Sequence, residues 1–248
     1  QTCALPISVW KILRGLAHLL AGWWTLRVHF PRLSVEQREM RVQAWSLQFL
    51  ALWGIHLRVL GQPVAAGPAL LVANHISWLD ILVIHAARYY RFVSKSDIRD
   101  WPMLGTLATA SGTLYIERSR RKDALRMVRD MAQALQDGDV LAVFPEGTTS
   151  DGLNLLPFHA NLIESAVAAQ APVQPLALRF VDARTGEPTL APCYIGDDTL
   201  ITSVWRTLTA PPIVAVVHFG QPQQAEGRER RQWARDLREA VQGLREPV

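Results

Sequence analysis

The sequence has few cysteines, and this scarcity restricts its compartment and its chemistry. Cys3 and Cys193 are the two cysteines among 248 residues. They provide no disulfide framework and fit a protein kept in a reducing compartment. No Gly-x-Ser-x-Gly segment occurs, so we do not expect a serine acyl-enzyme. The histidines apart from His75 show no metal-ligand spacing, and we expect neither a metal nor another cofactor.

Long apolar runs are also missing. The longest uncharged apolar stretch, residues 15–26, spans about 18 Å as a helix, which is short of the hydrocarbon layer of about 30 Å. Hydrophobic residues make up 49% of the chain, far below the content of a polytopic membrane protein. Zinc-finger, helix-turn-helix and RNA-binding signatures are absent, so the net charge of +4 does not indicate a nucleic-acid partner.

The net positive charge of the chain is concentrated near its start. Residues 1–60 contain seven Lys or Arg against two Glu, together with five of the nine tryptophans. Basic residues interleaved with Trp and Leu are typical of contact with an anionic membrane surface. We expect helices over 9–30 and 34–53, the second opened by a capping box at Ser34, that form a hairpin lying in one leaflet. The alternative is a helix pair that simply packs on the domain.

The remainder of the chain predicts an α/β fold. Strand patterns alternate with helical ones, which favours a mixed, largely parallel central sheet flanked by helices. The predicted strands are 55–60, 69–73, 91–95, 113–117, 140–144, 173–180 and 213–219, and the clearest helices are 123–137 and a charged one from 226. We therefore divide the chain into an N-terminal membrane-association segment, 1–54, and a second domain, 55–248. Residues 1–8 resemble a translated sequencing adapter and are left out of the functional interpretation.

Two polar segments follow two of these strands, Asn74 to Asp80 and Phe144 to Ser150. Positions five apart on one helix differ by about 140°, so His75 and Asp80 can cooperate only if the chain turns between them. We expect Ser77 to be the N-cap of a helix with Asp80 in its first turn. The carboxylate would then orient His75 as a general base. The alternative for an isolated pair is a surface histidine beside a capping aspartate.

These motifs resemble the glycerolipid acyltransferase family, whose best-known members acylate lysophosphatidic acid. The shared blocks are Asn-His-x-Ser-x-x-Asp at 74–80, Phe-Pro-Glu-Gly-Thr at 144–148, Gly-x-x-x-Ile-x-Arg at 112–118 and the proline-bracketed segment 172–176. The resemblance implies that His75 and Asp80 are catalytic. It also implies that the acceptor or donor is bound by Glu146, Gly147, Thr148, Arg118 and Lys95. Alternatives are an arginine partner for Glu146 and solvated surface charges for Arg118 and Lys95.

The reaction implied is transfer of a fatty acyl group from acyl-CoA or an acyl carrier protein to a lysolipid hydroxyl, without other cofactors. Such an enzyme would lie on the cytoplasmic face of the inner membrane of a bacterium. At position 149 the lysophosphatidic acid enzymes usually carry arginine, whereas this chain has Thr149 in a run that resembles the lyso-ornithine lipid branch. By its frequency in the family we expect 1-acylglycerol-3-phosphate as the acceptor, and Thr149 makes lyso-ornithine lipid or another lysolipid the alternative. More distant alternatives are a lipid hydrolase and a non-catalytic membrane-binding module.

Overall fold

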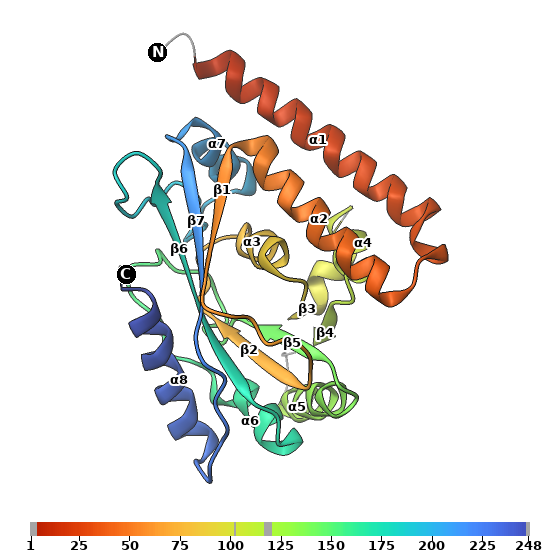
Figure 1. Cartoon of the computed structure of the whole chain (residues 1–248), viewed down its shortest axis with the longest axis vertical. Coiled ribbons are helices and arrows are strands. Elements are labelled where there is room, and N and C mark those ends of the chain that lie inside the picture. The colour runs from red at the N-terminus through yellow and green to blue at the C-terminus, as the bar shows by residue number, and fades with distance from the viewer. Residues whose placement is uncertain (1–3, 102, 117–120, 247–248) are drawn as a thin grey trace.

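A twisted mixed sheet forms the centre of the molecule (Figure 1). The computed structural model describes residues 4–101, 103–116 and 121–246. Within them, seven strands lie in the order β1-β7-β6-β2-β5-β3-β4. Strands β6, β2, β5, β3 and β4 are parallel, and β7 and β1 run the opposite way. The predicted mixed, largely parallel sheet is therefore confirmed. The strands are β1 Ile55–Leu60, β2 Ala69–Ala73, β3 Arg91–Lys95, β4 Leu114–Ile116, β5 Val140–Val143, β6 Val173–Asp182 and β7 Ile213–Phe219.

Helices cover both faces of the sheet, because the central strands bury side chains on both sides. In β2, Leu71 and Ala73 join the core beneath α2 and α3, whereas Leu70 and Val72 join the core beneath α5, α6 and α8. The helical elements are α1 Ala4–Val28, η1 Phe30–Arg32, α2 Val35–Trp53, α3 Asp80–Ala87, η2 Ser96–Asp100, α4 Leu104–Ala110, α5 Arg121–Gln136, α6 Ala160–Ala169, α7 Leu200–Thr209 and α8 Arg230–Leu244.

The strands differ from the sequence prediction only at their ends. Strand β6 continues to Asp182, two residues beyond the predicted end, because its last residues pair with Val214 and Ile213 of β7. Strand β5 ends at Val143, one residue early. Neither shift changes the sheet order, which is set by the buried central strands.

The two N-terminal helices form the predicted hairpin. Ser34 Oγ accepts the Gln37 N–H and Gln37 Oε1 accepts the Ser34 N–H, so the capping box is present. Helix α1 begins at Ala4 rather than at residue 9, and it ends at Val28 rather than near residue 30 because Pro31 lies in the short η1 turn. Glycines let α1 approach α2 closely: a Cβ at Gly15 would lie 2.5 Å from Trp53 Nε1.

The hairpin shares the core of the sheet. Phe49, Leu50 and Trp53 of α2 are buried in the same cluster as Leu71 of β2 and Val83 of α3. Deleting the hairpin would therefore remove part of the core, and its role is better tested with surface substitutions. Within the described part of the chain, no helix has the length and hydropathy that crossing a bilayer requires.

Candidate active site

The polar segments meet because β2 and β5 are adjacent and parallel. Their carboxyl ends lie at one edge of the sheet, the usual position of ligand sites in open α/β sheets. This brings the turn 74–80 beside the turn 144–150. Lys95 is exposed at the carboxyl end of β3, the next strand along.

His75 and Asp80 are in direct contact. The imidazole Nδ1 lies 2.8 Å from Asp80 Oδ2, with Asp80 fully buried and the His75 side chain 20% exposed. A carboxylate can only accept, so Nδ1 carries the hydrogen and Nε2 presents its lone pair. The ring also stacks on Phe144, with centroids 4.0 Å apart, which restricts its rotation. The arrangement is suited to taking a proton at Nε2.

Asp80 also holds the turn that carries the histidine. Its Oδ2 accepts the Ile76 N–H at 2.6 Å and the Ser77 N–H at 2.9 Å. Helix α3 begins at Asp80 with Leu79 as N-cap, so the prediction that Ser77 is the N-cap was wrong. The Ser77 hydroxyl accepts the nearby Leu79 N–H, but it also donates to the Pro192 carbonyl, a tertiary contact that holds Ser77 in the turn ahead of the helix.

Glu146 braces the other side of this turn. Its Oε1 accepts the His75 N–H and its Oε2 accepts the Leu156 N–H, each at 2.8 Å. Burial raises the pKa of Glu146, and the two backbone hydrogen bonds partly offset this rise. Glu146 is only 3% exposed, and it forms no ion pair with an arginine in the described ranges. The sequence did not indicate this contact between Glu146 and the His75 backbone.

The residues after Glu146 complete the turn. Gly147 has φ +74°, a conformation that suits glycine, and Thr148 is exposed at the site. The Ser150 N–H and hydroxyl both donate to the His75 carbonyl, at 2.8 and 3.3 Å. The backbone of His75 is thus held at both its N–H and its C=O.

A third segment, residues 192–194, reaches both turns. The Tyr194 N–H donates to the Ile76 carbonyl, and the Thr149 hydroxyl donates to the Tyr194 carbonyl. Cys193 is buried here, and burial raises the pKa of its thiol to about 11, which does not suit a nucleophile. Sequence reasoning missed this segment because backbone groups of an irregular loop supply most of these contacts.

Asn74 is a further residue whose role the sequence did not reveal. Its side-chain amide donates to the Leu178 carbonyl at 3.0 Å, and its side-chain oxygen accepts the Leu178 N–H at 2.7 Å. Asn74 thus continues the pairing of β2 with β6 by one step and fixes where the chain leaves the sheet. An asparagine directly after an apolar strand was the available sequence signal, and the structure shows that Asn74 is fully buried. Arg118 lies outside the described residues.

The mixed sheet with polar turns at its carboxyl edge is that of an α/β enzyme, and comparisons with known proteins give its family. Residues 56–179 match the Acyltransferase family. A lyso-ornithine lipid O-acyltransferase from Pseudomonas aeruginosa is 36% identical over 223 residues, covering 90% of this chain and 85% of that protein. A 1-acyl-sn-glycerol-3-phosphate acyltransferase from Neisseria gonorrhoeae is 39% identical over 186 residues, which cover 74% of this chain and 72% of that protein. This chain belongs to the Acyltransferase family.

A solved structure shares the fold. The crystal structure of the 1-acyl-sn-glycerophosphate (LPA) acyltransferase PlsC from Thermotoga maritima superposes with a TM-score of 0.68. The match covers 100% of this chain and 99% of that one, at 17% identity. The likeness therefore includes the N-terminal helices as well as the sheet.

The contacts of Glu146 suggest a test of whether it positions the His75 turn or binds the acceptor. Glu146→Gln places an amide NH2 against one of two backbone donors, so the free energy of unfolding should fall by about 1–3 kcal/mol. If Glu146 positions His75, kcat should fall while KM for the acceptor changes little. Urea unfolding and steady-state kinetics measure both, with Glu164→Gln on α6 as the matched control. A raised acceptor KM with unchanged stability would instead assign Glu146 to binding.

Proposed function

We propose that the protein transfers a fatty acyl group from an acyl thioester to the free hydroxyl of a lysolipid, with His75 as general base. The observation that carries the proposal is the 2.8 Å contact of His75 Nδ1 with buried Asp80, which leaves Nε2 free to take a proton. The relatives named above support the choice of a lysolipid as acceptor.

Each step of the reaction has a group to perform it. The acceptor oxygen attacks the thioester carbonyl carbon while His75 Nε2 removes its proton. The tetrahedral intermediate then collapses to the new ester as the C–S bond breaks, and the imidazolium gives its proton to the leaving thiolate, which regenerates neutral His75. Asp80 stabilises the imidazolium formed on the way. The attack is direct, because the nearby Ser77 hydroxyl donates to the Pro192 carbonyl and Cys193 is a buried thiol.

Two acceptors remain candidates, 1-acylglycerol-3-phosphate first and lyso-ornithine lipid as the alternative. Thr148 and Lys95 are exposed at the carboxyl edge of the sheet, where an acceptor headgroup would meet them. Thr149 directs its hydroxyl to the Tyr194 carbonyl and offers no fixed cation. Lys95, and Arg118 as the resemblance implies, would supply positive charge for a phosphate.

Membrane binding is proposed for the outer face of α1. Six exposed apolar side chains fall within about 120° of one helical face: Val9, Trp10, Leu13, Leu16, Leu20 and Trp24. Arg14 and Arg27 are exposed on the same helix and suit anionic headgroups. The hairpin would then lie on the cytoplasmic face of a bacterial inner membrane and present the site to lysolipid in that leaflet.

Removing the base tests the reaction. His75→Ala should lower acyl transfer by about 10² to 10⁴, and Asp80→Asn should also lower turnover, because the imidazole loses its orienting acceptor. The measurement uses labelled acyl thioester and a panel of lysolipids, with His56→Ala, exposed on β1, as control. Near-normal kcat in folded His75→Ala would exclude this base. Free acid alone in the wild-type assay would indicate a hydrolase, and no reaction at all would leave a membrane-binding module.

Headgroup selection is tested at Thr149. Thr149→Arg restores a cation that could contact a phosphate, a bond worth about 1.5–3 kcal/mol. The kcat/KM ratio for lysophosphatidic acid over lyso-ornithine lipid should therefore rise in the variant. Thr149→Val, which loses the hydroxyl without gaining charge, is the control. An unchanged ratio in Thr149→Arg would show that position 149 does not contact the headgroup.

The α1 face is tested by placing charge on it. Leu13→Glu with Leu20→Glu should weaken binding to vesicles containing anionic lipid by about ten-fold or more, since each leucine loses its apolar burial. Flotation with vesicles measures the bound fraction. The control is Leu125→Glu with Leu153→Glu, two leucines that are exposed elsewhere. Equal flotation of the two double variants would place the membrane contact on another surface.

A further inference from the structure

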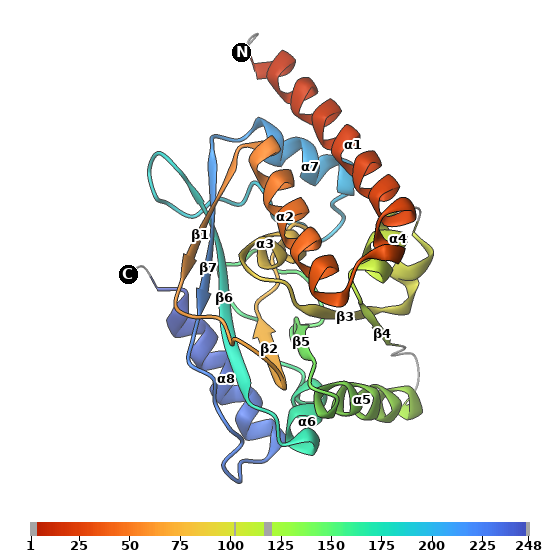
Figure 2. The ribbon, with the colours of Figure 1, turned by 45° about the vertical axis from the view of Figure 1, so that its right-hand side comes forward.

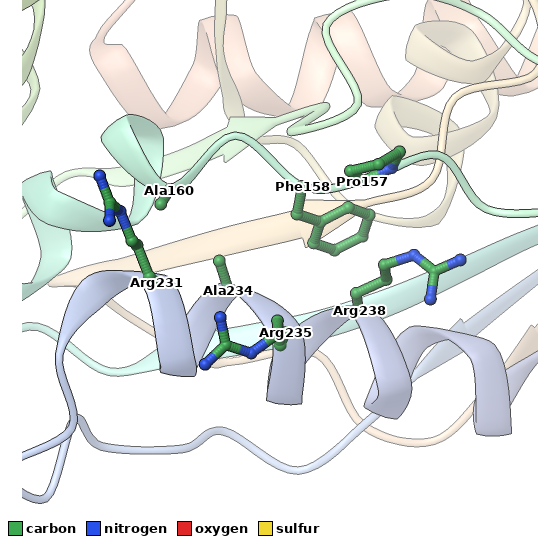
Figure 3. Close-up of a pocket in the computed structure, with 7 residues that line it drawn as sticks. All are labelled: Pro157, Phe158, Ala160, Arg231, Ala234, Arg235 and Arg238. Atoms are coloured by element: carbon green, nitrogen blue, oxygen red, sulfur yellow. The ribbon is translucent and has the colours of Figure 1, made fainter.

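One face of α8 carries a row of arginines beside an open hollow. Arg231, Arg235 and Arg238 recur at intervals of four and three residues, so they share one side of the helix along about 10 Å of its length. They line a hollow of about 350 Å³ together with Pro157, Phe158, Ala160 and Ala234. Figure 3 shows the Phe158 ring directed toward α8, with Arg231 at one end of the hollow and Arg238 at the other.

Unlike the neighbouring arginines of this region, these three form no ion pair with a carboxylate of the described residues. Arg228 pairs with Asp236 at 3.0 Å, and Arg230 pairs with Glu164 at 3.5 Å. Across the described ranges, no carboxylate lies within ion-pair distance of the three lining arginines. Arg231 and Arg235 are exposed. A concentration of one sign of charge attracts an anionic partner and raises its association rate.

The hollow is close to the catalytic turn. Arg238 donates to the carbonyls of Leu155 and Leu156 at 2.6 and 3.1 Å. The Leu156 N–H donates to Glu146, whose other oxygen accepts the His75 N–H. Phe158 follows Leu156 by two residues, a reach of about 7 Å at most. A molecule held in the hollow is therefore near the turn that carries His75.

The same hollow lies away from the proposed membrane face. Figures 1 and 2 both place α8 across the sheet from α1. With the outer face of α1 on a bilayer, α8 would face the aqueous phase. Lipid headgroups of that bilayer would not reach the arginine row, so its partner would be soluble. Of the two proposed substrates, the acyl thioester is the one that arrives from solution.

We propose that Arg231, Arg235 and Arg238 dock an acidic protein surface that delivers the acyl thioester, namely an acyl carrier protein. This inference rests on the proposed function and selects its donor. The row spaces three cations by about one helical turn each, which matches carboxylates spread over a protein surface better than one compact phosphate group. Phe158 and Ala234 form an apolar floor that is largely buried, so the arginines would provide most of the contact with the partner.

The test reverses the charge of the two exposed arginines. Arg231→Glu with Arg235→Glu should raise KM for palmitoyl-acyl carrier protein by about ten-fold or more, with kcat little changed. KM for palmitoyl-CoA should stay within about two-fold. Arg126→Glu with Arg129→Glu, two exposed arginines of α5, is the matched control. Arg238 is left intact because it holds the loop before the hollow.

Several outcomes would overturn the inference. One is an equal KM for palmitoyl-acyl carrier protein in the two double variants. Another is an equal rise in KM for palmitoyl-CoA, which would assign the arginine row to binding nucleotide phosphates. Loss of binding to anionic vesicles in the α8 variant would assign it to the membrane. Titration calorimetry with the acyl carrier protein measures docking without turnover. If no donor supports transfer by the wild type, the proposed function fails, and carrier binding that weakens only in the α8 variant would still support the docking surface.

Discussion

The site depends on two buried carboxylates that hold one turn of backbone. Asp80 accepts hydrogen bonds from the His75 ring and from the N–H groups of Ile76 and Ser77, and Glu146 accepts the His75 N–H. A buried carboxylate is costly unless donors satisfy it, and here most of the donors are backbone N–H groups of the turn. All three bonds to Asp80 are accepted by Oδ2, and its buried Oδ1 has no hydrogen-bond partner among the described residues. The turn therefore cannot relax without leaving a carboxylate short of hydrogen bonds. The orientation of the imidazole is a consequence of this constraint.

The same constraint extends to the loop between β5 and α6. Glu146 binds the N–H of Leu156, and Arg238 of α8 binds its carbonyl, so the loop is held from both sides. Arg245, near the end of α8, donates to the Gly152 carbonyl of the same loop. Helix α8, on one face of the sheet, thus stabilises the loop that positions His75. Changes on α8 can reach the site through these hydrogen bonds.

The two surfaces proposed to bind the membrane and the acyl donor belong to different helices. Helices α1 and α8 lie across the sheet from each other (Figures 1 and 2), and His75 follows β2 at the carboxyl edge of that sheet. A lipid acceptor would come from the bilayer, whereas a soluble acyl donor would come from the aqueous phase. Under the proposed function the two substrates would meet at the His75 imidazole, and approach from opposite sides would keep them from competing for one surface.

The sequence by itself determined the strands, several of the helices and the pairing of His75 with Asp80. Buried runs and their alternation predicted the strands, the Ser34 capping box predicted α2, and helical geometry required a turn between His75 and Asp80. These features depend on neighbours within a few positions. The contacts of Glu146 with the His75 backbone and of Ser77 with Pro192 span 71 and 115 positions, so no local pattern records them. Only the tertiary structure decides them, because the strand order sets which loops share the carboxyl edge of the sheet.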